Sequence, residues 1–129
     1  MTRDARLPEG LAQPGPPYSP VIVAGDLVYT AGQVALDAEG AIVPGGIEEQ
    51  TEQVLDNVER CLAAAGCSMD DVVKVTAFLS DLDEFEGFNR VYARRFERPY
   101  PARSTVGVRL APGLLVEVEA VARIPRAAG

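Results

Sequence analysis

The sequence predicts an α+β fold in which a mixed β-sheet carries two helices on one face. Two segments with helical spacing of apolar residues are separated by a single β-branched segment, and hairpin patterns stand at both ends of the chain. The chain has 129 residues, of which 47% are apolar and 24% charged, as in ordinary globular domains. We therefore expect one domain over residues 1–129.

The first elements are a lead-in and a hairpin. Residues 1–17 are rich in proline, which predicts an extended segment without a helix. Two apolar, β-branched runs follow at 21–24 and 27–31, joined by a Gly-Asp pair, and this pattern predicts a β-hairpin. Residues 33–36 are expected to continue as a strand or a bend.

The middle and end of the chain supply both helices and three strands. Apolar residues at helical spacing predict helices over 47–65 and 83–96, and the second carries an aromatic stripe. Between them, the β-branched segment 71–80 predicts a strand. Two further strands are expected at 103–110 and 115–124, joined as a hairpin by a turn that contains a Pro-Gly pair.

Two helices are too few to cover both faces of this sheet. The strand at 71–80 has apolar residues on both of its sides. We therefore expect the face without helices to be buried against another copy of the chain.

Composition excludes several classes of function. The chain has no histidine, which rules out Ser-His-Asp and Cys-His catalysis and histidine-ligated zinc. Its net charge of −7 argues against nucleic-acid partners.

No run of apolar residues is long enough for a membrane span, and the first residues have no apolar signal-peptide core, so we expect a cytoplasmic protein without a membrane partner. Cys61 and Cys67 lack metal-site spacing, and we expect unreactive thiols.

One pair of residues in the last two strands could carry chemistry. Alternation places Arg103 and Thr105 on one side of their strand, and a hairpin would put Glu117 on the neighbouring strand. From this pattern alone, a surface ion pair worth about 0–1 kcal/mol is the simpler interpretation.

The sequence also resembles the reactive-intermediate deaminase (Rid/YjgF, L-PSP) family. The resemblance extends from about residue 14 to 123, in the family's order and spacing. It rests on the segments 15–20, 28–34, 47–51, 64–66, 70–76, 101–106 and 116–122, together with Asn57, Asn89, Tyr92 and Phe96.

This resemblance implies a chorismate-mutase-like fold and a homotrimer whose sheets pack into a central barrel, with clefts between subunits. It implies hydrolysis of 2-imino or 2-enamino acids to 2-oxo acids and ammonia without metal or cofactor. By resemblance, Arg103 grips the substrate carboxylate and Glu117 positions or activates water. The remaining residues expected to bind substrate are Tyr18, Ala31, Gly32, Asn89 and Thr105.

Some positions depart from the family pattern. Ala31 stands where a serine is usual, and Thr105 stands where a cysteine is usual. These departures suggest a paralogue with an altered substrate range. They also leave open a second hypothesis, a non-catalytic trimer that binds small carboxylates or 2-oxo acids. A nuclease or translation inhibitor is a third hypothesis, against which the acidic charge and missing histidines speak.

Several candidate residues also have purely structural interpretations. Tyr18 could be a packing aromatic, Asn89 a solvated helix residue and Thr105 an ordinary β-strand residue. Glu119 and Lys74 are expected to be structural. The family context changes the interpretation most for Arg103.

Overall fold

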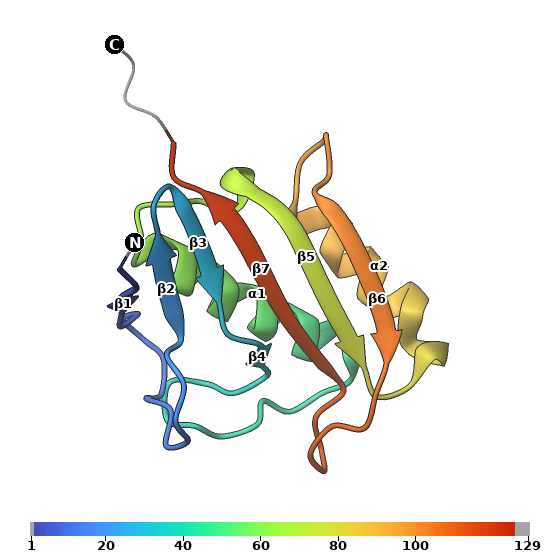
Figure 1. The fold of residues 1–129 in the computed structure, drawn as a ribbon. Coiled ribbons are helices and arrows are strands. Elements are labelled where there is room, and N and C mark those ends of the chain that lie inside the picture. Colours follow the sequence, from blue (N-terminus) through green and yellow to red (C-terminus); the bar gives the residue numbers. More distant parts are fainter. Residues whose placement is uncertain (1, 126–129) are drawn as a thin grey trace.

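The computed structural model describes residues 2–125, which form one seven-stranded sheet with the helices on a single face (Figure 1). The strand order is β1-β2-β3-β7-β5-β6, and the short strand β4 also pairs with β7. The predicted α+β fold with two helices on one face is thus confirmed for the single chain. The trimer and its barrel stay predictions.

One half of the sheet is an antiparallel meander near the N-terminus. It contains β1 (Asp4–Arg6), β2 (Val21–Ala24) and β3 (Leu27–Thr30). The predicted hairpin corresponds to β2 and β3, with Gly25 at a φ of 64° in its turn. The proline-rich lead-in is extended, as predicted, and its residues 4–6 form β1 by pairing with the edge of β2.

The other half of the sheet has a topology that differs from the predicted hairpin. It contains β4 (Gln33–Val34), β5 (Val72–Leu79), β6 (Ala102–Gly107) and β7 (Val116–Arg123). Strand β6 runs parallel to β5, and β7 pairs with the other side of β5 in antiparallel orientation. The expectation that Arg103 and Glu117 lie on adjacent strands is therefore wrong, because β5 lies between them.

The two long helices are α1 (Ile47–Ala63) and α2 (Phe85–Arg95). At the start of α1, the backbone N–H of Gly46 donates to the side chain of Glu49 at 2.7 Å, which satisfies one backbone donor. Arg95 on α2 joins the two helices by donating to Asp56 on α1 at 2.8 Å. Two short 3₁₀ helices, Met69–Asp71 and Leu82–Glu84, flank β5.

The core lies between the sheet and the helices. Alternate residues of β5 and β7 point into it, and the opposite residues point to the uncovered face. A bulge between Val72 and Lys74 shifts this alternation by one residue. As a result Val72 points into the core, as Val75 does, and Val73 is 49% exposed. Tyr29 and Val106 are also large exposed apolar residues on the uncovered face.

Candidate active site

Arg103 lies on β6, the edge strand beside α2. It pairs in register with Val75, a buried residue of β5, so its side chain points to the face that the helices cover. Three aromatic rings surround the guanidinium, and its Cζ atom lies 4.6 Å from the ring centre of Tyr92, 5.3 Å from Phe88 and 5.7 Å from Phe85. These distances are typical of cation–π contacts.

The guanidinium of Arg103 is held by these rings and not by an acid. No ion pair joins Arg103 to a carboxylate within residues 2–125. Contact with the faces of rings leaves the N–H groups in the plane of the guanidinium available. Those N–H groups are the donors that bind a carboxylate in two parallel hydrogen bonds. The arrangement therefore suits binding of a small anion.

A hollow of about 310 Å³ adjoins Arg103. Asn89 lines it from α2, and Tyr100 and Pro101 line it from the segment before β6. Thr105 lies two residues further along β6 on the same face, and its hydroxyl is buried without a hydrogen-bond partner in the described chain. The structure thus brings Arg103, Asn89 and Thr105 into one region.

Glu117 belongs to a different region of the molecule. It lies on β7 between the buried residues Val116 and Val118, so its own side chain points to the uncovered face of the sheet. Its carboxylate packs over the backbone of Gly32, where an added Cβ would lie 2.8 Å from Cδ of Glu117. Gly32 therefore allows a close approach that a larger residue would prevent.

Tyr18 and Ala31 lie near this second region. Tyr18 and Gly32 line one small hollow of about 70 Å³, and 53% of Tyr18 is exposed. The backbone N–H of Ala31 donates to Pro20 at 2.8 Å, which ties the segment after Tyr18 to the end of β3. The structure thus groups Tyr18, Ala31 and Gly32 with Glu117.

Burial changes the acidity of Glu117. Partial burial raises the pKa of the Glu117 carboxyl, and the nearby Glu119, on the same face of β7, raises it further. A carboxylate with a raised pKa is a better proton acceptor than an ordinary surface glutamate. Glu117 is therefore suited to take a proton from water.

The two groups of predicted site residues do not meet within one chain. Arg103 is in register with Val75, whereas Glu117 is in register with Phe78 on the other side of β5. The two side chains also point to opposite faces of the sheet. A site that uses both residues therefore requires a second copy of the chain.

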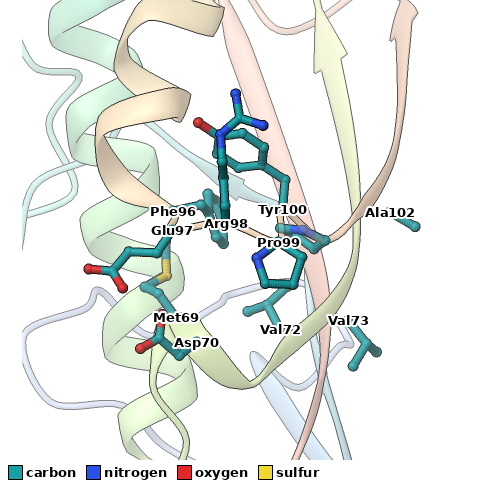
Figure 2. Close-up of a pocket in the computed structure, with 11 residues that line it drawn as sticks. Met69, Asp70, Val72, Val73, Phe96, Glu97, Arg98, Pro99, Tyr100 and Ala102 are labelled. Carbon is teal, nitrogen blue, oxygen red and sulfur yellow. The ribbon is translucent and has the colours of Figure 1, made fainter.

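The larger hollow in Figure 2 contains none of the predicted site residues. It measures about 470 Å³ and lies where α2 ends and β5 begins. Arg98 stacks on the ring of Tyr100, with its Cζ atom 5.0 Å from the ring centre. Tyr100 and Pro101 line both this hollow and the one beside Arg103, so they form a shared wall.

Neither cysteine lies in the candidate site. Cys61 and Cys67 are both buried free thiols, and burial raises the pKa of Cys61 to about 12. Residues 2–125 contain no cluster of three metal-ligating side chains. No helix in that part of the chain is long and apolar enough to cross a membrane.

Comparison with known proteins identifies the family. The family model for Endoribonuclease L-PSP matches residues 11–124. The chain belongs to the Rid/L-PSP family. The resemblance seen in the sequence is thereby confirmed over almost the whole chain.

Relatives within the Rid/L-PSP family bear several names. The chain is 46% identical to the RutC family protein PH0854 of Pyrococcus horikoshii, over 88% of this chain and 92% of that protein. It is 41% identical to a 2-iminobutanoate/2-iminopropanoate deaminase of Capra hircus, over 82% and 79% of the two chains. The crystal structure of E. coli TdcF with bound serine has a TM-score of 0.86 and 31% identity, covering 93% of this chain and 98% of TdcF.

The sequence did not reveal the aromatic contacts of Arg103. The stripe of Phe85, Phe88 and Tyr92 has the spacing of ordinary core residues on a helix. The consecutive order of α2 and β6 was a usable signal, because the connection between two parallel strands places a helix against the sheet.

Proposed function

We propose that this protein is an imine deaminase that hydrolyses a small 2-imino or 2-enamino acid to the 2-oxo acid and ammonia. The observation that carries the proposal is the guanidinium of Arg103, which stacks on aromatic rings, pairs with no acid in residues 2–125 and borders a hollow of about 310 Å³. The relatives named 2-iminobutanoate/2-iminopropanoate deaminase support the choice of substrate.

In this proposal Arg103 binds the substrate carboxylate through two parallel hydrogen bonds and so fixes the position of the C=N carbon. Glu117 accepts a proton from water as the water oxygen bonds to that carbon. The proton that Glu117 accepted passes to the imine nitrogen. The nitrogen then takes the remaining proton of the added hydroxyl as the C–N bond breaks, the C=O bond forms and ammonia leaves. Tyr18, Asn89 and Thr105 are proposed to contact the substrate around this centre.

We further propose that the site forms between subunits of a homotrimer. Support comes from the positions of Arg103 and Glu117 on opposite faces of one sheet and from exposed apolar side chains on the uncovered face, including Tyr29 and Val106. Because Arg103 lies on the edge strand β6, a second copy that packs on the uncovered face and extends past that edge would bring its Glu117 region near the Arg103 region. Light scattering should give the mass of three chains.

Binding without turnover is the alternative that the departures at Ala31 and Thr105 favour. The serine-bound structure of TdcF supports a site for small carboxylates in this family. RNA cleavage, which the family description names, has little support in this chain because its net charge of −7 disfavours phosphate contacts.

A trapping assay separates these functions. An amino-acid oxidase generates the imino acid in situ, and semicarbazide traps the imine that remains. We expect the wild-type protein to reduce the semicarbazone formed, and Arg103→Ala to lose this effect. If the wild type binds 2-oxobutanoate by calorimetry but leaves semicarbazone formation unchanged, the protein is a binding module and the enzymatic proposal fails.

A further inference from the structure

The three rings around Arg103 have a consequence for how the site binds an anion. A free arginine side chain samples many rotamers, and ordering it costs free energy each time a ligand binds. An arginine that is already ordered before binding avoids that cost. An acidic partner would order it too, but would occupy the N–H groups that the ligand needs.

Aromatic rings order the guanidinium without using its N–H groups. The rings of Phe85, Phe88 and Tyr92 all come from α2, so one rigid element sets their positions. Phe88 is fully buried and Tyr92 is 5% exposed, whereas Phe85 is 40% exposed at the rim. The ring of Tyr92 is nearest, with its centre 4.6 Å from Cζ of Arg103.

We propose that Tyr92 is a positioning residue whose ring holds the guanidinium of Arg103 in the orientation that binds a carboxylate. The proposal rests on the function proposed above and adds the means by which the anion site is organised. The ring, and not the hydroxyl, performs this role. Packing supports Tyr92 from behind, because its ring centre lies 4.5 Å from that of Phe96.

The hydroxyl of Tyr92 makes a clean experiment possible. The hydroxyl is buried and has no hydrogen bond of good geometry in the described chain, but the Arg103 guanidinium lies near enough to interact with it. Tyr92→Phe removes this hydroxyl and keeps the ring, so it measures the contribution of the hydroxyl separately. Burial raises the pKa of Tyr92 to about 12 although the Arg103 guanidinium acts in the opposite direction, so the phenol is neutral at physiological pH. Tyr92→Leu removes the ring and keeps an apolar side chain.

The test measures the dissociation constant of 2-oxobutanoate by calorimetry for each variant. Loss of a cation–π contact predicts weakening by roughly fivefold to thirtyfold for Tyr92→Leu. Tyr92→Phe should bind within about threefold of wild type, because a phenyl ring also attracts the cation. Phe85→Leu, at the exposed rim, should weaken binding by roughly twofold to fivefold. It is the second variant in which a ring is removed from Arg103, to be measured if Tyr92→Leu does not fold.

Phe96→Leu is the matched control. Phe96 is 4% exposed and packs on Tyr92, but it is absent from the rings over Arg103. It should lower stability and weaken binding much less than Tyr92→Leu does, because the Tyr92 ring itself remains. Weakening by Phe96→Leu equal to that by Tyr92→Leu would make the effect one of packing and overturn the proposal. Equal weakening by Tyr92→Phe would assign the effect to the hydroxyl and overturn it too.

A second measurement is independent of any ligand. Protons of the Arg103 guanidinium lie over ring faces, so their NMR signals should be shifted upfield, and Arg103→Ala identifies them by their loss. We expect Tyr92→Leu to reduce this shift and Tyr92→Phe to retain it. An unchanged shift in Tyr92→Leu overturns the positioning role. If the wild type binds no 2-oxo acid, the proposed function fails, and the NMR shift alone decides whether Tyr92 orients Arg103.

Discussion

Replacement of Arg103 by lysine separates the charge of the side chain from its shape. Lysine keeps the positive charge, but a single ammonium cannot lie against three rings and also donate two parallel hydrogen bonds to a carboxylate. The expected loss is one charge-assisted contact, about 1.5–3 kcal/mol. This corresponds to a decrease in kcat/KM on the order of tenfold to a hundredfold.

The assay follows imine loss by semicarbazide trapping and the binding of 2-oxobutanoate by calorimetry. Folding should survive the substitution, because Arg103 forms no ion pair within residues 2–125. Arg109→Lys is the matched control, because Arg109 is exposed beyond the end of β6, and it should behave like wild type. Binding of 2-oxobutanoate by Arg103→Lys or Arg103→Ala as tight as that by the unmodified protein would refute the role of the Arg103 guanidinium in carboxylate binding.

Three further predictions concern the region of Glu117 and the thiols. The raised pKa of Glu117 predicts that kcat falls as the pH drops through a midpoint above the ordinary carboxyl value of 4.5. Glu119→Gln removes a nearby negative charge and should move that midpoint down. A midpoint that Glu119→Gln does not change contradicts this prediction. Gly32→Ala should lower kcat by up to about a hundredfold, because the added Cβ displaces the Glu117 carboxylate. In the control Gly15→Ala, the added Cβ meets no atom within 4 Å, so kcat should not change. Equal rates for the two variants would argue against the close packing of Glu117 on Gly32. Replacing both cysteines by alanine should leave imine hydrolysis within a few-fold, and complete loss in a folded protein would show that a thiol takes part.

Local pattern was sufficient to predict most elements of this fold. Period-two and helical spacing located the helices and the central strands to within a few residues. The order of β6 and β7 was mistaken because a Pro-Gly turn suggested a hairpin. The helix between β5 and β6 makes these two strands parallel neighbours, and the connection over residues 108–115 is long enough for β7 to pass to the other side of β5.

The candidate site was predictable in its residue types but not in its arrangement. Alternation correctly placed Arg103 and Thr105 on the same side of a strand. The position of Glu117 on the opposite face depends on the strand order, which no local pattern determines. The rings around Arg103 depend on how α2 packs on the sheet, and their spacing alone indicates only a helix with one apolar face.

The central claim is that Arg103 of one subunit and Glu117 of another form one hydrolytic site. The direct test is to unfold and refold together equal amounts of Arg103→Ala and Glu117→Gln, each inactive alone, and to measure imine hydrolysis. With random assembly, a shared site contains both intact residues about a quarter of the time, so about a quarter of wild-type activity should return. If mixed oligomers form and no activity returns, the site does not lie between subunits and the account is wrong.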